Sequence, residues 1–273
     1  MAVVNGSDGS QGRATTWLAK GLKIEEAQIC IRRDQKRLDS QSTDIQRLAL
    51  ARRADRLTSE VSAFITEASG YLGMDWDASL LDDCDIEENG VDEDAIGKHR
   101  QQQTDKVKIP LPSNLGETQC RHFRILGLWQ KELKLREGQA NDALHKIRLA
   151  LANKAVLFRT DVRHALSHAK TTRAWSKVHS MDTILQRHAS VYRQCRKAII
   201  DLGADELCLN RYRPLKDEDL KVTAAVVGPN SRGHHNDTLA WFWSMDVPRD
   251  TKANDWMSEC EPRADFRDLA DFV

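Results

Sequence analysis

The apolar residues between positions 43 and 73 recur at the spacing of a helix, and this restricts what that part of the chain can fold into. Thr43 and Gln46 have the spacing of a capping box, in which each side chain satisfies a backbone amide at the start of a helix. The apolar residues that follow are separated by alternating steps of four and three, as on a heptad seam: Leu50, Ala54, Leu57, Val61, Phe64 and Ala68. The pattern predicts a helix that ends at Gly70 to Gly73.

A shorter apolar pattern of the same period precedes this helix. Its positions are Ile24, Ala27, Ile31 and Leu38. A polar stretch at 39–42 separates the two patterns, and helices joined by a short turn usually pack antiparallel. We therefore predict a helical hairpin over residues 17–73. Residues 1–16 are rich in Gly, Ser and Asn and are expected to be disordered.

The longest apolar stripe lies in the second half of the chain. Its positions are Leu126, Trp129, Leu133, Ala140, Leu144, Ile147, Leu151, Ala155, Phe158, Val162 and Ala165. A local irregularity is expected at Gly138 and a break at Thr171 and Thr172. A further helix then runs to Gly203, so residues 109–203 are predicted to form a second, longer hairpin. The tryptophans on or beside these stripes, including Trp175, are expected to pack in the core.

The remaining segments lack this helical period. From Met74 to Gly97 the chain has ten acidic residues and no Lys or Arg, so residues 74–108 are predicted to be an acidic, disordered linker. Residues 204–258 are expected to hold short helices and a Trp-rich element, followed by an atypical polar tail at 259–273. No series of alternating strands occurs. The predicted fold is all-α, with two long antiparallel, coiled-coil-like helical hairpins on either side of the linker.

Cysteine usage and hydropathy indicate an intracellular chain. The six cysteines form no CxxC pair and follow no secretory signal, so we expect reduced thiols and a nuclear or cytoplasmic protein that is not secreted. No apolar run approaches the roughly 20 residues that cross a bilayer, which predicts that the chain does not enter a membrane.

A histidine pair is the strongest candidate for a metal site. His164 and His168 have the i, i+4 spacing of two ligands on one helix face. Neither an HExxH glutamate nor a suitably spaced Cys/His pair accompanies them, so solvated surface histidines are expected. An enzyme interpretation would require His164, His168 and Asp161 to converge on a metal ion. The sequence also lacks a GxSxG elbow and a phosphate-binding glycine loop after a strand. We therefore predict no catalytic residue, metal, cofactor or small-molecule substrate, and a chain that is not an enzyme.

A basic stretch gives the one candidate binding surface. Lys131 to Ile200 holds fifteen Lys and Arg against five acidic residues, although the whole chain has a formal net charge of zero. If the helix there is unbroken, six cations fall within a sector of roughly 80°: Arg148, Arg159, Arg163, Lys170, Arg173 and Lys177. Such a stripe can bind nucleic-acid phosphates, face solvent, or dock onto an acidic segment such as residues 75–94.

Five segments of the chain resemble a known family. They are Trp17–Gln28, Leu111–Gly116, Leu135–Arg148, Arg211–Leu220 and Asn236–Ser244. Together they are similar to the C-terminal region of the Kyakuja–Dileera–Zisupton (KDZ) transposase-like proteins of fungi. The resemblance covers about residues 17–258, and its most specific part is the run Gln-Ala-Asn-Asp-Ala-Leu-His from Gln139 to His145.

The resemblance implies an accessory region and no catalytic site. In that family a cysteine-cluster domain and an RNase H-like catalytic domain precede this region, and the chain is expected to begin after both. Its end also departs from the family pattern, from Cys260 to Val273. The resemblance and the basic stretch together favour a non-catalytic, transposase-derived region that contacts nucleic acid or mediates assembly. The alternatives are a structural coiled-coil module that associates with itself or with another transposase-like chain, and a decayed transposon fragment without selected function.

Overall fold

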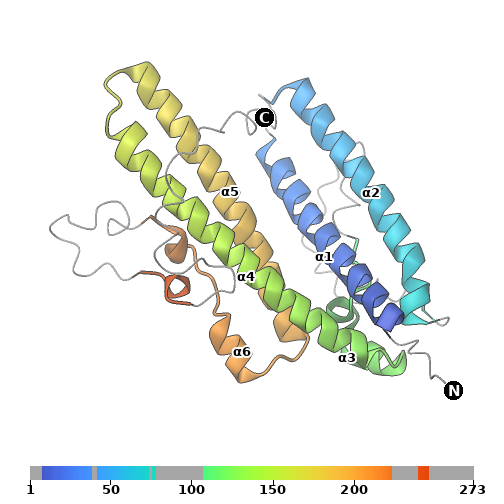
Figure 1. Cartoon of the computed structure of the whole chain (residues 1–273). Helices are drawn as coiled ribbons and strands as arrows, with labels where there is room; N and C mark the ends of the chain where they lie inside the picture. The colour runs from blue at the N-terminus through green and yellow to red at the C-terminus, as the bar shows by residue number, and fades with distance from the viewer. Residues whose placement is uncertain (1–7, 39–41, 74–75, 78–106, 223–238, 246–273) are drawn as a thin grey trace, which may run out of the picture. The chain divides into compact units, whose positions relative to one another are not determined.

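The computed structural model describes residues 8–38, 42–73, 76–77, 107–222 and 239–245 (Figure 1). Every regular element within these residues is helical, so the all-α prediction is confirmed for them. None of the described helices combines the length and the apolar character that crossing a membrane requires. The predicted acidic linker at 74–108 lies outside the described residues except for 76–77 and 107–108, as does the whole of the tail at 259–273.

The chain divides into two compact units. Unit 1 comprises Met1–Glu137 and Lys197–Asp205, and unit 2 comprises Gly138–Arg196 and Glu206–Val273. Two long helices, α4 (Leu126–Leu157) and α5 (His168–Asp201), contribute a segment to each unit.

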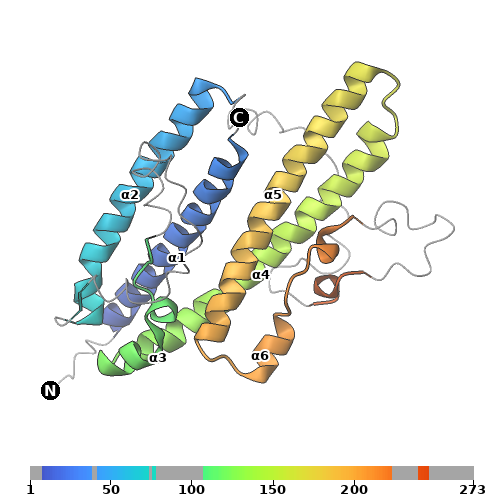
Figure 2. The ribbon, with the colours of Figure 1, turned by 180° about the vertical axis from the view of Figure 1, so that it is seen from behind.

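Unit 1 is built around helices α1 (Asp8–Arg37) and α2 (Asp44–Leu72), which lie side by side in Figure 1 and Figure 2. Two ion pairs connect them, Lys20 to Glu67 at 2.9 Å and Asp34 to Arg53 at 2.8 Å. Because the partner's number falls along α2 as the residue number rises along α1, the two helices run in opposite directions. Helix α1 begins at Asp8, inside the segment expected to be disordered, and its burial of Trp17 anchors this early start.

Local sequence signals explain the bounds of α2. The capping box is present, since the Gln46 amide donates to Thr43 Oγ1 at 3.3 Å and the Thr43 amide donates to Gln46 Oε1 at 3.0 Å. The helix ends at Gly73, which has a positive φ of 105°. All six positions of the predicted seam are buried, together with Leu72. They share one core cluster with Trp17, Leu18 and Leu22 of α1, so this seam is covered within the chain.

The segment before helix α3 (Pro112–His122) also enters the core of unit 1. Leu111 has the extended conformation that a following proline favours, and Pro112 occupies the first turn of the helix. Ile109 and Leu111 are buried. Gly21 of α1 permits the close approach of Leu111 and of Phe64 from α2, because a Cβ atom there would lie 2.8 Å from Leu111 Cδ2 and 2.7 Å from Phe64 Cζ.

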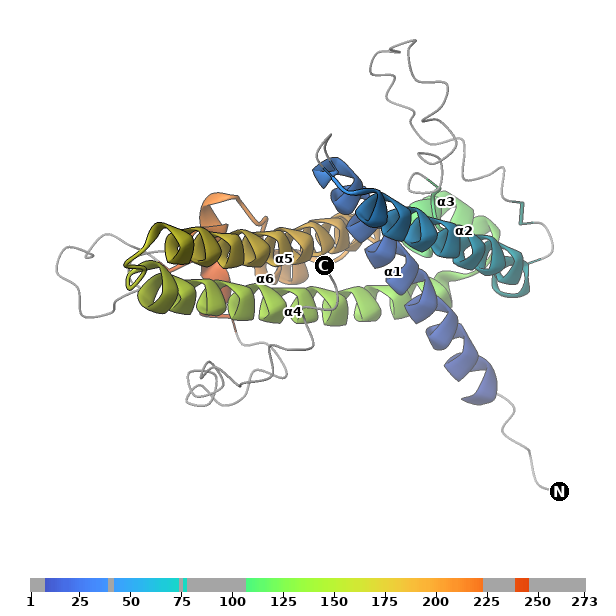
Figure 3. The same ribbon diagram turned by 90° about the horizontal axis from the view of Figure 1, so that it is seen from above.

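In unit 2, α4 and α5 lie side by side, as Figure 1 and the view from above in Figure 3 agree. The irregularity predicted at Gly138 is absent, because α4 continues through this residue. It occurs instead after Leu157, where a π-helical turn, η2 (Phe158–Val162), ends the helix.

The break that was predicted at Thr171 and Thr172 is also misplaced, because α5 begins at His168. The Thr171 and Thr172 hydroxyls donate to the carbonyls of Ser167 (3.1 Å) and His168 (3.0 Å), so both threonines are accommodated inside the first turns of α5.

The C-terminal part of unit 2 contains α6 (Glu206–Arg211) and two short turns, η3 (Glu218–Leu220) and η4 (Trp241–Trp243). Arg148 of α4 donates to the carbonyls of Phe242 and Met245, and the Phe242 ring is fully buried. The Tyr192 hydroxyl donates to the Arg213 carbonyl at 2.8 Å. These contacts hold the described C-terminal segments against α4 and α5.

Helix α5 ends in the second segment of unit 1. Gly203 has a positive φ of 64° and donates to the Ile200 carbonyl, while the Ala204 amide donates to the Ile199 carbonyl. This is the Schellman arrangement, which satisfies the last carbonyls of a helix and favours glycine. The prediction that Gly203 terminates the helix is confirmed.

Candidate nucleic-acid interface

The connection between α4 and α5 in unit 2 carries a group of exposed cations. Residues Phe158–Lys177 are named the basic tip here and form the end of the α4–α5 pair coloured yellow-green to yellow in Figure 1. The tip contains one acidic residue, Asp161, and five cationic ones. The five are all exposed: Arg159, Arg163, Lys170, Arg173 and Lys177. The tip therefore has a formal charge of +4, not counting histidine.

Helix geometry places three of these cations on one face of α5. Lys170, Arg173 and Lys177 fall within a sector of about 60°, because successive residues turn by about 100°. On the neighbouring face, Ala174 (3% exposed) and Val178 (2%) are buried. Ser167 precedes the helix and caps it, since its hydroxyl accepts from the Lys170 amide at 3.4 Å. The buried stripe thus fixes the direction in which the cations point.

Carboxylates neutralise only part of this charge. Lys177 Nζ lies 2.7 Å from Asp161 Oδ2, and the hydrogen bond from Lys177 holds the pKa of Asp161 below its usual value. Within the described residues, the side chains of Arg159, Arg163, Lys170 and Arg173 take part in no ion pair. Four cationic groups of the tip therefore face solvent without a carboxylate.

Arg148, the sixth residue of the predicted stripe, does not join the tip. Its side chain is buried (9% exposed), and its guanidinium donates to two backbone carbonyls as described above. The stripe also assumed an unbroken helix. In the structure, Arg159 and Arg163 precede the break and Lys170 follows it, so the chain turn brings five of the six residues to one end of unit 2.

Two side chains at the tip are more exposed than their apolar character suggests. Trp175 is 43% exposed although its position on the apolar stripe predicts a core residue, and Leu166 is 93% exposed. The indole of Trp175 meets the Phe158 ring edge-on, with centroids 6.0 Å apart. The sequence signal that was missed is the nearby end of the helix, because a stripe residue there is only partly covered, in this case by the Phe158 ring.

His164 and His168, the candidate metal ligands in the sequence, both lie in the tip. No group of three or more His, Cys, Asp or Glu among the described residues could hold a metal ion, so His164, His168 and Asp161 do not converge. The cysteines in the described ranges, Cys30, Cys120, Cys195 and Cys208, are all free thiols.

Comparison with protein-family models, curated proteins and solved structures finds no match for this chain. The tip is therefore interpreted from its own charge and geometry, and the resemblance to KDZ transposase-like proteins stays a prediction.

Proposed function

We propose that this chain is a non-catalytic, transposase-derived accessory region that contacts nucleic acid through the basic tip. The observation that carries the proposal is the set of four exposed cations without a carboxylate partner among the described residues: Arg159, Arg163, Lys170 and Arg173. An external polyanion can satisfy these groups at once. A role of this kind would be exercised inside the cell, in the nucleus or the cytoplasm.

The energetic basis is the release of counterions. Nucleic acid concentrates cations along its phosphates, and each protein cation that contacts a phosphate returns one of them to solution. Cations on a rigid support bind with a larger net gain in free energy than cations on a flexible segment, because less side-chain and backbone freedom is lost on binding. The base of the tip is such a support, since Ala174 and Val178 fix α5 against its neighbours.

Assembly through a helical seam is the second candidate function. The clearest seam in the sequence, on α2, is buried against α1 and is not available to a second chain in this structure. This favours nucleic-acid contact over assembly by that route. Docking of the tip onto residues 75–94 involves a segment that lies, apart from 76–77, outside the described residues. Light scattering at several concentrations without nucleic acid tests assembly, which requires a concentration-dependent increase in mass.

The first test is fluorescence anisotropy of a labelled DNA duplex titrated with the full chain at about 50 and about 200 mM salt. With four phosphate contacts, the logarithm of affinity should fall with the logarithm of salt with a slope of about −3.6, which is roughly a 150-fold loss over this interval. Absence of binding at the lower salt concentration overturns the proposal.

A charge-reversal pair locates the binding surface. Arg163→Glu with Arg173→Glu should lower the affinity at about 50 mM salt by at least tenfold and reduce the salt slope by about 2. The matched control is Arg52→Glu with Arg56→Glu, which changes the net charge equally at exposed positions of α2. If the control weakens binding as much as the tip variant does, net charge accounts for binding and the tip is not the site.

A further inference from the structure

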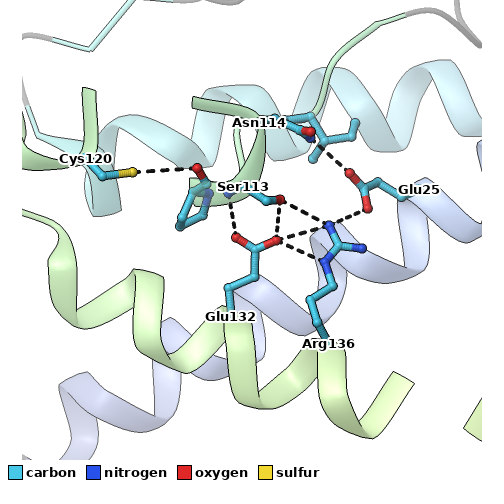
Figure 4. Close-up of polar contacts among 8 residues, drawn as sticks. Glu25, Ser113, Asn114, Cys120, Glu132 and Arg136 are labelled. Atoms are coloured by element: carbon cyan, nitrogen blue, oxygen red, sulfur yellow. Dashed lines mark hydrogen bonds and ion pairs between the residues drawn. The ribbon is translucent and has the colours of Figure 1, made fainter. Parts of the chain in front are cut away.

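A cluster of charged side chains is buried in unit 1, where α1, α3 and α4 meet (Figure 4). Glu25 comes from α1, and Glu132 and Arg136 come from the unit 1 segment of α4. Their exposed fractions are 5%, 0% and 1%, so none of the three charges is hydrated to a significant extent. We refer to these three residues as the buried triad.

One guanidinium serves both carboxyl groups of the triad. Arg136 Nη2 lies 2.6 Å from Glu25 Oε2 and 3.0 Å from Glu132 Oε1, and Arg136 Nε donates to the same Glu132 oxygen at 3.1 Å. Figure 4 shows the guanidinium between the two carboxyl groups. In the described part of the chain, no other cation forms an ion pair with either glutamate.

Helix α3 supplies neutral donors only. Ser113 donates to Glu132 through its amide (2.9 Å) and its hydroxyl (2.6 Å), and Asn114 Nδ2 donates to Glu25 Oε1 at 2.9 Å. These hydrogen bonds orient the carboxyl groups without adding positive charge. With both glutamates ionised, the triad would carry a net charge of −1 in the interior, which is strongly unfavourable.

The other titratable groups that face the triad do not compensate for this charge. Burial and the neighbouring Glu132 raise the pKa of the Cys120 thiol to about 12, so it stays neutral. Asp201, at the end of α5, has a pKa raised by burial, which Lys197 and Arg136 partly offset, and Lys197 itself is exposed. Burial likewise raises the pKa of Glu132, against the opposing effects of Arg136 and Ser113, and Glu25 raises it further.

We propose that the folded chain keeps one proton on the Glu25–Glu132 pair at a pH at which an exposed glutamate has lost it, and that loss of this proton loosens the contact of α1 and α3 with α4. The proton comes from solvent during folding and returns to solvent on unfolding. When it is present, the pair and Arg136 together are neutral. When it leaves, the uncompensated charge is relieved by admitting water between the three helices.

The direction of the pH dependence follows from proton linkage. Below the ordinary glutamate pKa of 4.5, the folded and unfolded chains both hold the proton, and the full contribution of the triad to stability is present. Above that pKa, only the folded chain still holds the proton. The unfolding equilibrium constant then rises by about tenfold per pH unit, until the raised pKa of the folded state is passed. Stability from the triad is therefore lost as pH rises.

The test compares the full-length chain with its Glu132→Gln variant in urea denaturation at a series of pH values from about 4.5 upward. The amide of glutamine has the shape of the protonated carboxyl group and bears no charge. In the wild type, the unfolding equilibrium constant should rise by about tenfold per pH unit because of the triad, and the variant should lack this rise. In the variant, the protection of the α1 and α3 amides from hydrogen exchange should also be the same at every pH tested. The exposed Glu117→Gln variant, whose partner is Arg121, is the matched control and should keep the wild-type dependence.

The protonation of the glutamates can also be measured directly in the wild-type chain, so that the test does not depend on whether a variant folds. In the wild-type chain labelled with ¹³C at the glutamate carboxyl carbons, one carboxyl resonance should titrate well above the others, and it should be absent from Glu132→Gln or Glu25→Gln. The proposal is overturned if every glutamate of the folded wild-type chain titrates in the ordinary range. It is overturned equally if Glu132→Gln and the wild type unfold with the same pH dependence.

Discussion

Arginine occupies opposite environments in the buried triad of unit 1 and in the basic tip of unit 2. In unit 1, Arg136 is 1% exposed and contacts two buried carboxyl groups. In unit 2, Arg163 and Arg173 are exposed at the basic tip and form no ion pair with the described residues. Arg148 shows that unit 2 can also bury a guanidinium, in this case against backbone carbonyls. A buried arginine fixes the packing of its neighbours because its donors need acceptors in set positions, whereas an exposed one remains available to an external anion.

Truncation of the buried arginine should give the largest effect. Arg136→Leu leaves Glu25 and Glu132 without a counter-charge in the core, so the free energy of unfolding should fall by about 3–5 kcal/mol near neutral pH. Urea denaturation measures this loss. It should be smaller at pH 4.5, where protonation relieves part of the uncompensated charge.

Removal of an exposed cation should lower the free energy of unfolding much less than removal of Arg136. Lys177→Met removes the Asp161 ion pair, whose side chains are 62% and 31% exposed, and should cost less than about 1 kcal/mol. Equal losses for the two variants would show that the charges of unit 1 and unit 2 contribute alike, contrary to the comparison.

One substitution made in two helices should change stability in opposite directions. Gly21→Ala places a methyl group against Phe64 and Leu111, which are both fully buried, and should destabilise the chain by about 1–3 kcal/mol. Gly138→Ala meets no atom within 4 Å and improves the helix propensity of α4, so it should stabilise by up to about 1 kcal/mol. Thermal and urea denaturation of both variants measure this difference. A neutral Gly21→Ala would mean that α1 can move away from its neighbours.

A half-buried histidine, His188, should give unit 2 a pH dependence of the opposite sign from that of the triad. Burial, helped by Lys146 and Arg187, lowers the pKa of His188 to about 4. The unfolded chain takes up the proton near the ordinary pKa of 6.5, so stability is lost as pH falls from about 6.5 to about 4. Because His188 is partly exposed, the loss should be on the order of 1 kcal/mol. Hydrogen exchange along α5 in the wild type and in His188→Gln, which cannot titrate, measures it. An unchanged pH dependence in the variant contradicts this assignment.

The smallest expected effect concerns the one acid of the tip. Asp161→Asn frees Lys177 for a phosphate, so duplex affinity at about 50 mM salt should rise by a few-fold and the salt slope should steepen by about 0.9. Anisotropy titration tests this, with Asp182→Asn as the control because it frees Lys154, which precedes the tip. Unfolding should change by less than about 1 kcal/mol. Unaltered affinity would place Lys177 outside the binding surface.

The parts of the fold that could be predicted are those with a complete local signal. Thr43 and Gln46 contain both halves of their cap, the α2 seam follows a single period, and Gly203 is the residue type that a left-handed position requires. Each of these depends on neighbours a few residues away. The break between α4 and α5 has no such local signal. Threonine hydroxyls can bond to carbonyls within a helix, so Thr171 and Thr172 do not end one.

Which face of α4 is buried was harder to predict, because charged residues occupy part of that face. The predicted stripe began with Leu126, which is 48% exposed, while Glu132 and Arg136 are buried. These two continue the buried positions Ala140 and Leu144 backward in steps of four, so a periodic signal was present in the sequence. Residue type concealed it, since ionised side chains are seldom placed in a core without a partner. Arg148 was wrongly assigned to the candidate site for the same reason, because its charge suggested an exposed side chain and the side chain is buried.

The π-helical turn η2 has a consequence for how this surface can change. A π-turn holds one residue more than an α-turn, so removal of a single residue from Phe158–Val162 would restore α-helical winding there. Because the π-turn accommodates its extra residue within about one turn, the residues after it, including Arg163, would keep nearly the same direction about the helix axis. The distribution of cations at this end of unit 2 is therefore expected to persist when one residue other than Arg159 is deleted from this turn. Related chains that differ by one residue in length within this turn would therefore be expected to keep the surface.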